Sequence, residues 1–381
     1  MHNTSRTLEL LDHLIAYPTV SQNSNLDLIV WAESHLRDWG FDVTRIWSPD
    51  RTKAGLFARI GPKVDGGICL SGHTDVVPVE GQHWTHPHFT LSHVGDRVYG
   101  RGSTDMKGFV ASALAIAEQA GKHTLKAPLS LVLSYDEEIG CVGIREMLPQ
   151  LTPLLGKPDL VIVGEPTSMQ IAIGHKGKAA LSVTCTGESG HSALAPNFVN
   201  AIHVASHFIA EIRALQSRLM QGTQDSAYDI PYSTVHVGTI SGGRALNIVP
   251  DLVMLSMEYR HLHNTGPDIL GDINAIAKRT AEAFAAPAAI SIETLNTYPG
   301  LDVNIAHPVI DQTRQLTEKT GTIKVAFGTE AGFFAGLGLD TLVIGPGSMA
   351  ADGHKPDEGL DLAELRACDT MMARVLEQLS A

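Results

Sequence analysis

Five short stretches of the sequence carry histidines and carboxylates that could bind metal ions. Each follows an apolar run or lies in a glycine-rich loop. They are Ser-Gly-His-Thr-Asp at 71–75, Gly-Ser-Thr-Asp-Met-Lys-Gly at 102–108, Asp-Glu-Glu at 136–138, Gly-Glu-Pro at 164–166 and Gly-His-Lys-Pro-Asp-Glu at 353–358. No cysteine occurs in them, so the donors are the imidazole nitrogens and carboxylate oxygens that Zn²⁺ and related divalent ions accept.

Taken one at a time, each candidate ligand has an ordinary structural explanation. The chain has 18 histidines, so His73 or His354 alone is more often a loop residue. Asp105 and Glu165 fit turns, and Glu138 fits the start of a helix, where the dipole favours an acid. Their coincidence at successive strand ends and adjoining loops favours a metal site instead. Such a set suits a pair of Zn²⁺ ions bridged by one carboxylate.

Alternating strands and helices must position these stretches. Apolar or alternating runs predict strands at 41–47, 55–60, 67–70, 129–134 and 159–163, and helices at 5–16, 26–39, 107–118 and 142–151. In the second helix, Asn25 is the predicted N-cap and Gly40 the residue that ends it. This alternation predicts an α/β domain with a mainly parallel sheet and helices on both faces. Ligands of such sheets gather beyond the carboxyl ends of the strands, where three of the five stretches fall.

The pattern changes near residue 179, which indicates a separate unit. Strands are predicted at 180–186, 234–240, 252–259 and 288–294, with helices at 200–219 and 269–284. This β-α-β-β-α-β order is typical of a ferredoxin-like fold. The remainder reverts to α/β, with helices at 308–318, 330–337 and 361–379 and strands at 323–327 and 341–344. We therefore predict a catalytic domain made of residues 1–178 and 295–381, with an α+β domain inserted at 179–294.

Composition restricts the location and partners. The formal net charge of −13 argues against nucleic acid or an anionic membrane surface as a partner. No apolar run approaches the roughly 20 residues of a membrane span, and the N-terminus lacks a signal-peptide pattern. The cysteines, Cys69, Cys141, Cys185 and Cys368, are scattered, which favours reduced and mostly buried thiols. We expect a soluble cytoplasmic protein.

Together these motifs resemble those of the M20 metallopeptidases, over essentially the whole chain. The resemblance is carried by 71–75, by Gly-Arg-Gly-Ser-Thr-Asp-Met-Lys-Gly at 100–108, by 136–138 and by Gly-His-Ser-Ala at 190–193. It implies two Zn²⁺ ions per subunit, for which Co²⁺ could substitute. His73 and Glu165 would hold one ion, Glu138 and His354 the other, and Asp105 would bridge them. It also implies a cis peptide bond after Asp105.

The resemblance further implies roles for two carboxylates beside these ligands. Asp75 would accept the free ring N–H of His73 and fix its tautomer, a role that the chemistry of the pair also suggests. Glu137, next to the ligand Glu138, would act as general base toward the attacking water and then protonate the leaving amine.

The inserted domain would supply groups for the substrate. His191 would stabilise the oxyanion in the active site of the partner subunit, in a homodimer formed through this domain. The alternative is a polar loop residue that caps the following helix. Asn247 and Arg260 would bind the substrate α-carboxylate, a task that suits a guanidinium, and Gly328 would belong to the substrate site. Arg260 could instead form a surface ion pair.

Further stretches resemble those of family members that act on acetylated ornithine. They are Ser-Tyr-Asp-Glu-Glu-Ile-Gly-Cys at 134–141, Gly-Glu-Pro-Thr-Ser-Met at 164–169, Gly-His-Lys-Gly at 174–177, Phe-Gly-Thr-Glu-Ala at 327–331 and Gly-Pro-Gly-Ser at 345–348. The implied function is a metal-dependent amidohydrolase that converts N2-acetyl-L-ornithine to L-ornithine and acetate in arginine biosynthesis. N-acetylcitrulline, N-succinyl-diaminopimelate and other N-acyl amino acids stay open as substrates, as does a non-catalytic member that uses the inserted domain for assembly.

Overall fold

The structure, a computed structural model, describes all residues except 1–3, 22 and 264. The chain forms two compact units, and each is described by itself. The larger comprises Met1–Gly174, Asp302–Val325 and Thr329–Ala381, and the smaller comprises His175–Leu301 and Ala326–Gly328. The smaller unit is longer than the segment 179–294 expected from sequence, because its first strand already begins at Gly177 and its last strand ends at Tyr298, and because Ala326–Gly328 also belongs to it.

A nine-stranded sheet is the centre of the larger unit among the described residues. Its order is β1-β2-β6-β3-β7-β15-β8-β13, with β14 beside β8. The bounds are β1 Asp42–Trp47, β2 Ala54–Ile60, β3 Ile68–His73, β6 Leu129–Ser134, β7 Leu160–Val163, β8 Ile171–His175, β13 Leu301–Asp302, β14 Thr322–Val325 and β15 Thr341–Val343. Strands β6, β3, β7 and β15 pair in parallel, whereas β1, β2 and β8 pair antiparallel. The predicted α/β class is confirmed, with the parallel strands at the centre of the sheet.

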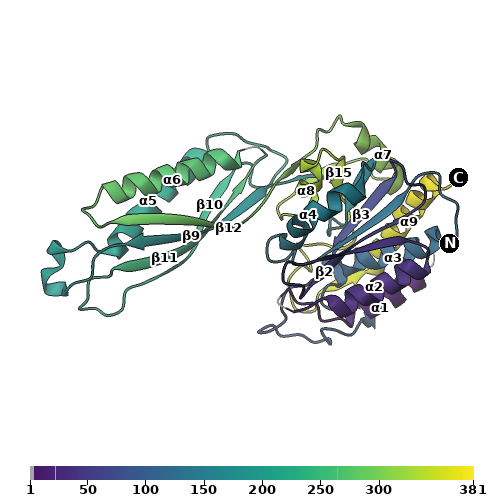
Figure 1. The fold of residues 1–381 in the computed structure, drawn as a ribbon, viewed down its shortest axis with the longest axis horizontal. Helices are drawn as coiled ribbons and strands as arrows, with labels where there is room; N and C mark the ends of the chain where they lie inside the picture. Colours follow the sequence, from purple (N-terminus) through teal and green to yellow (C-terminus); the bar gives the residue numbers. More distant parts are fainter. Residues whose placement is uncertain (1–3, 22, 264) are drawn as a thin grey trace. The chain divides into compact units, whose positions relative to one another are not determined.

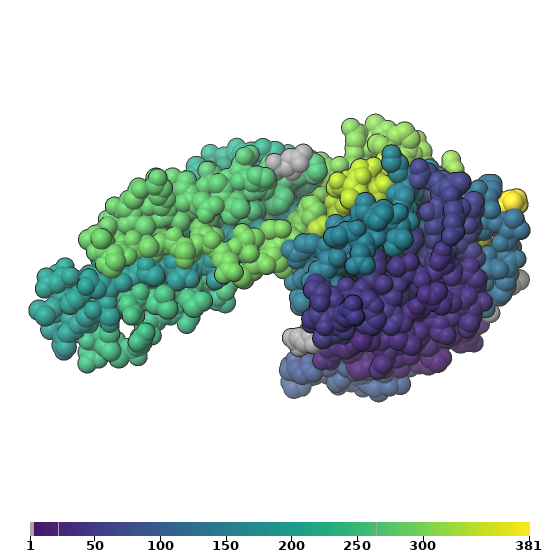
Figure 2. Space-filling view, in the orientation of Figure 1, coloured from purple at the N-terminus to yellow at the C-terminus, as the bar shows by residue number. Residues whose placement is uncertain are grey.

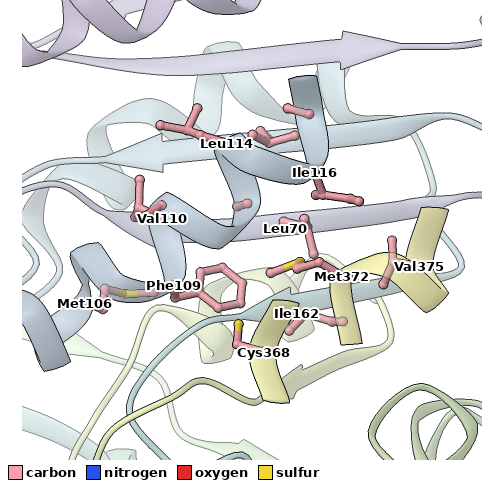
Figure 3. Close-up of a cluster of buried hydrophobic side chains, with 14 of the residues drawn as sticks. Leu70, Met106, Phe109, Val110, Leu114, Ile116, Ile162, Cys368, Met372 and Val375 are labelled. Atoms are coloured by element: carbon pink, nitrogen blue, oxygen red, sulfur yellow. The ribbon is translucent and has the colours of Figure 1, made fainter. Parts of the chain in front are cut away.

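Helices pack on this sheet and on one another. Their bounds are α1 Thr4–Ile15, α2 Leu26–Asp38, α3 Gly108–Ala120, α4 Val142–Leu155, α7 Pro308–Thr317, α8 Ala331–Gly336 and α9 Leu362–Leu379. Helix α3 is apolar almost all round, so it is buried rather than amphipathic. Figure 3 shows Val110 and Leu114 of α3 in one cluster with Leu70 of β3 and Met372 of α9. In the space-filling view, the purple N-terminal residues form much of the face of this unit that is turned to the viewer (Figure 2).

Three very short strands form a second sheet in the larger unit. Its order is β16-β5-β4, with β4 Ser92–Val94, β5 Arg97–Tyr99 and β16 Gly359–Asp361. The sequence analysis missed all three, because three residues are too few to show a periodicity. The antiparallel pairing of β5 with β16 places Tyr99 opposite Gly359. The glycine-rich loop after β5 therefore lies beside the segment that precedes β16.

Helix α2 begins at Leu26 and ends before Gly40, as predicted, but it lacks the expected side-chain cap. Gly40 has a φ of 89°, the left-handed conformation that favours glycine at this position. Asn25 makes no side-chain cap on α2. Its amide instead exchanges two hydrogen bonds with the backbone of Ala54 and donates one to the hydroxyl of Thr74. Asn25 therefore stands at the predicted N-cap position, but its side chain does not cap the helix, because these long-range partners occupy it.

The smaller unit is an antiparallel sheet covered by two helices. The sheet order is β10-β11-β9-β12, with β9 Gly177–Thr186, β10 Thr234–Gly242, β11 Leu252–His261 and β12 Ala289–Tyr298. Helices α5 (Ala201–Leu219) and α6 (Gly266–Glu282) lie side by side on it (Figure 1). Side chains of β9 alternate between buried and partly exposed, as expected of a half-buried strand. The chain order is the predicted β-α-β-β-α-β.

None of the helices in the described part of the chain is long and apolar enough to cross a membrane. All four cysteines are buried and free.

Candidate metal centre

The five predicted ligands come from three strand ends and two loops of the larger unit. His73 is the last residue of β3, Glu138 follows β6, and Glu165 follows β7. Because β6, β3 and β7 are parallel neighbours, their carboxyl ends meet at one edge of the sheet. Asp105 lies in the turn before α3, and His354 lies in the loop before β16. The structure brings all five together at that edge.

Asp105 contacts both histidines, each with a different oxygen. Its Oδ1 lies 3.1 Å from Nε2 of His73, and its Oδ2 lies 3.2 Å from Nε2 of His354. Nε2 of His73 is also 3.8 Å from Oε1 of Glu165. Nε2 of His354 is 3.0 Å from Oε2 of Glu138. The arrangement is one central carboxylate between two pairs, each made of a histidine and a glutamate.

The donors present fit a site for two divalent cations. Oε1 of Glu138 and Oε1 of Glu165 are buried and accept no hydrogen bond within the described residues. Ligand atoms of His73, Glu137 and Glu165 lie within 4.8 Å of one another, as do those of His73, Asp105 and Glu138. Buried carboxylates are costly unless a cation or hydrogen-bond donors compensate them. Two metal ions would supply that compensation here, and nitrogen with carboxylate donors suits zinc.

The electrostatics of this cluster show how closely its charges interact. Burial raises the pKa of Glu165 well above its ordinary value. Burial and the nearby charge of Asp105 raise the pKa of Glu138 to about 7. Hydrogen bonds to Asp105 and Glu138 raise the pKa of His354 to about 10. The pKa of His73 is also held well above its ordinary value, because hydrogen bonds with carboxylates outweigh the effect of its burial.

Asp75 joins the predicted ligand His73 to the loop that carries Glu137 and Glu138. The backbone N–H of Glu137 donates to Oδ1 of Asp75 at 3.1 Å, and that of Glu138 donates to Oδ2 at 3.3 Å. The hydroxyl of Ser21 donates to the same Oδ2 at 2.8 Å. Nδ1 of His73 lies 3.0 Å from the backbone oxygen of Asp75 and 3.5 Å from Oδ1. The sequence predicts that the Asp75 carboxylate accepts the ring N–H, whereas the shorter contact here is with the backbone oxygen. The contacts with Ser21 and the two backbone amides were not predicted.

The side chain of Glu137 has surroundings that suit proton transfer. Burial raises its pKa well above the ordinary value, and the charges of Glu138 and Glu330 act in the same direction. The thiol of Cys141 donates to its Oε1 at 3.3 Å. A carboxylate with a raised pKa can take a proton near neutral pH and later give it back. This geometry is compatible with the predicted role of general base.

The turn that carries Asp105 is anchored on both sides. Gly102 has a φ of 87°, which glycine adopts at no steric cost, and the peptide bond between Asp105 and Met106 is cis, as expected. Met106 is fully buried in the hydrophobic core (Figure 3). The N–H groups of Thr104 and Asp105 both donate to the buried carboxylate of Glu358, each at 2.9 Å. Sequence reasoning missed Glu358, although it ends the last of the five stretches.

His191 lies in the smaller unit. It is exposed, and its Nδ1 accepts a hydrogen bond from the backbone N–H of Ala193 at 3.1 Å. The ring therefore caps the short helix Ser192–Asn197, as the alternative interpretation expected. This cap involves only Nδ1 of His191, so Nε2 is not needed for the cap and could have a second role.

The predicted substrate-binding residues also lie in the smaller unit. Arg260 pairs with Glu258 in the same unit, with Nε 3.1 Å from Oε1. Asn247 is exposed. A Cβ atom at Gly328 would come within 2.2 Å of the ring of Tyr298, so packing alone requires glycine there. The roles of these residues toward a substrate stay predictions.

Comparisons with known proteins identify the family of this chain and agree with its fold. A family model for peptidase family M20/M25/M40 matches residues 69–378. An acetylornithine deacetylase from Yersinia pseudotuberculosis is 34% identical over 385 residues, which cover 97% of this chain and 96% of that protein. An M20 family metallo-carboxypeptidase from Sulfolobus solfataricus shares the fold, with a TM-score of 0.79 and 19% identity, over 97% of this chain and 98% of that one.

A further solved structure, from Bacillus subtilis, is described as a dinuclear metal-binding peptidase of the M20 family. It aligns with a TM-score of 0.69 and 14% identity over 98% of each chain. The whole-chain similarity and the family match lead to one conclusion: the chain belongs to peptidase family M20/M25/M40 and is a metal-dependent hydrolase.

Proposed function

We propose that the chain hydrolyses the acetyl amide bond of N2-acetyl-L-ornithine, giving L-ornithine and acetate, with two zinc ions per subunit. The observation that carries the proposal is the position of Asp105, whose two oxygens contact His73 and His354 separately. The proposed substrate comes from the acetylornithine deacetylase relative, which matches 97% of this chain at 34% identity. The ligand assignment is His73 and Glu165 on one ion, Glu138 and His354 on the other, and Asp105 on both.

Zinc bound by these ligands would polarise the acetyl carbonyl and make water a better nucleophile at neutral pH. Glu137 takes a proton from the attacking water, which adds to the carbonyl carbon. Glu137 then donates that proton to the amine nitrogen as the carbon–nitrogen bond breaks. Asp75 holds the backbone N–H groups of Glu137 and Glu138, so it orients the base and the adjacent ligand together.

His191 stabilises the oxyanion in this proposal, acting in the partner subunit of a homodimer formed through the smaller unit. The hydrogen bond from Ala193 uses Nδ1 of His191 as an acceptor. The neutral ring therefore carries its proton on Nε2. An N–H donor is what an oxyanion requires. The existing cap thus supports the proposed role, because it fixes the useful tautomer.

The substrate α-carboxylate is assigned to Arg260 and Asn247. Burial tends to lower the pKa of the Arg260 guanidinium, but Tyr298 and Glu258 outweigh this effect and keep the group charged. A charged guanidinium can bind a carboxylate through two parallel hydrogen bonds. The partner Glu258 is shared with Lys178, so Arg260 can turn to a substrate without leaving that carboxylate uncompensated.

We place this reaction in the cytoplasm, as a step of arginine biosynthesis. The four free, buried cysteines support a reducing compartment.

Steady-state kinetics on matched amides test the substrate assignment. The panel contains N2-acetyl-L-ornithine, N-acetyl-L-citrulline, N-succinyl-L,L-diaminopimelate and N-acetyl-L-methionine, each with the zinc-loaded protein. We expect kcat/KM for N2-acetyl-L-ornithine to exceed that of every other member by at least about tenfold, the difference that about 1.4 kcal/mol of transition-state binding gives. A higher kcat/KM for another member would reassign the substrate.

A further inference from the structure

The carboxylate of Glu358 is buried, with 1% of the residue exposed, and it accepts four hydrogen bonds. Oε1 accepts from the backbone N–H groups of Thr104 and Asp105, each at 2.9 Å. Oε2 accepts from the backbone N–H of Gly102 at 2.9 Å and from Nη1 of Arg101 at 2.7 Å. All four donors belong to residues 101–105. One side chain therefore fixes the loop that ends at the central carboxylate of the metal centre.

The amides of Thr104 and Asp105 lie in the first turn of a short, irregular helical segment, Ser103–Lys107, and first-turn amides have no acceptor within their own helix. Gly102 is left-handed, with a φ of 87°, and Asp105 departs from helical dihedrals. A buried N–H that loses its acceptor is destabilising, so the hydrogen bonds to Glu358 favour this shape of the loop. The position of the Asp105 carboxylate between His73 and His354 depends on that shape.

The same network reaches the segment that carries His354. Nη2 of Arg101 donates to Oε1 of Gln82 at 2.6 Å, and Nε2 of Gln82 donates to the backbone oxygen of His354 at 2.8 Å. Nη1 of Arg101 also lies 3.3 Å from the backbone oxygen of Lys355. Glu358 itself follows His354 by four residues. The network therefore ties two ligand-bearing segments that are distant in sequence.

We infer that Glu358 is a positioning residue for the metal centre: it fixes the backbone of 101–105, and thereby the place of the Asp105 carboxylate between His73 and His354. The inference rests on the proposed two-zinc site. The alternative is that Glu358 forms a buried ion pair with Arg101 and contributes only to the stability of the fold. Two of the four hydrogen bonds favour a positioning role, because they go to the backbone of Thr104 and of Asp105 itself.

The test compares zinc affinity in the wild-type protein and in Glu358→Gln. The amide keeps the size of the side chain but has one acceptor oxygen, so at least two of the four donors lose their acceptor. Metal-free protein is titrated with Zn²⁺ in competition with a chromogenic chelator. We expect the variant to lose about 10–100-fold in zinc affinity, the usual effect of removing a residue that supports metal ligands. The visible spectrum of the Co²⁺-loaded variant should also change, because it reports the ligand geometry.

Asp357→Asn is the matched control. Asp357 is the neighbour of Glu358, and its carboxylate accepts three hydrogen bonds, from the N–H and hydroxyl of Thr85 and from the N–H of His86. None of these involves residues 101–105. Its φ is 53°, a conformation that asparagine tolerates. The control should match the wild type in zinc affinity and in Co²⁺ spectrum, even if it lowers the thermal stability of the loop.

Far-ultraviolet circular dichroism of the metal-free proteins establishes that each variant is folded. If Glu358→Gln does not fold, Glu358→Asp replaces it, since it keeps the charge but is one methylene too short to reach the same amides. A folded Glu358 variant with wild-type zinc affinity and Co²⁺ spectrum would overturn the inference, whatever its melting temperature. Failure of the wild-type protein itself to bind zinc would instead overturn the proposed two-zinc site.

Discussion

The backbone N–H of Glu137 donates a hydrogen bond of 3.1 Å to the carboxylate of Asp75. Asp75 lies two residues beyond the proposed ligand His73, and its backbone oxygen contacts that ring at 3.0 Å. The proposed base and one proposed ligand are therefore held by the same residue. Burial tends to raise the pKa of Asp75, but hydrogen bonds and the charge of His73 hold it below its ordinary value. The group is thus an ionised acceptor.

Replacing Asp75 by asparagine tests this double role. Asparagine has one acceptor oxygen, so the N–H groups of Glu137 and Glu138 and the hydroxyl of Ser21 can no longer all be satisfied. We expect zinc affinity to fall about 10–100-fold and kcat to fall even when the site is saturated with zinc. Chelator competition and kinetics at high zinc measure the two effects.

Ser21→Ala is the control for Asp75→Asn. It removes one donor to Asp75 and leaves both backbone hydrogen bonds in place. Its effects on affinity and kcat should be much smaller. If the two variants were equally impaired, the bonds to the Glu137 and Glu138 amides would not be what matters.

Glutamine at 137 and at 138 should give opposite phenotypes. Glu137→Gln should retain close to two metal ions per chain and lose several orders of magnitude in kcat, because positioned general-base catalysis contributes about 10²–10⁴-fold and the same group protonates the amine. Glu138→Gln should instead lose metal, since it removes a charged ligand beside His354. Metal analysis together with kcat distinguishes the two. Exchanged phenotypes would mean that base and ligand were assigned the wrong way round.

Removal of the metal should abolish activity reversibly. The five proposed ligands are all histidines or carboxylates, which bind Zn²⁺ and Co²⁺ alike. Dialysis against a strong chelator should leave a folded, inactive protein, and two equivalents of Zn²⁺ or Co²⁺ should restore activity. The metal content of each sample is measured by mass spectrometry and compared with its kcat. Full activity in a protein shown to be free of metal would contradict the proposed mechanism.

Zinc binding should release protons and strengthen as the pH rises. Without metal, hydrogen bonds to Asp105 and Glu138 raise the pKa of His354 to about 10, so its ring is charged at neutral pH. A charged ring must lose its proton before it can bind zinc. Since pH 7 lies below this raised pKa, a higher pH favours the binding form. Calorimetry in buffers of different ionisation enthalpy counts the protons released. A zinc affinity that does not change between about pH 6 and 8 would contradict this expectation.

Subunit mixing tests whether His191 acts in the partner's active site. Homodimers of Glu137→Gln and of His191→Ala should both be nearly inactive. A hybrid dimer then has one site with both defects and one site with both groups intact. In a statistical mixture half of the dimers are hybrids, so recovered activity should approach about a quarter of wild type.

The control for this experiment is exchange itself, which is followed with differently tagged subunits. If exchange is complete and no activity returns, His191 acts within its own chain or only caps the helix Ser192–Asn197.

Much of the fold and the candidate ligands were predictable because the signals are local. The strands that end at His73 and before Glu138 and Glu165 are rich in apolar residues, which makes them recognisable in the sequence. Because these strands are parallel neighbours, their ends lie together. The order of strands and helices in the smaller unit also follows from local periodicity. Donor types are a property of the residues themselves, so the chemistry of the ligands was visible in the sequence.

Tertiary structure decided how those ligands are held. Strands β4, β5 and β16 have three residues each, and their pairing, not their sequence, makes them strands. Local rules predict that the side chain of Asn25 caps α2, but in the folded protein it donates hydrogen bonds to Ala54 and Thr74 instead. The acceptor for the N–H of Asp105 is Glu358, 253 positions away. A residue type at one position does not specify such a partner, because the hydrogen bond exists only after the sheets have brought the two segments together.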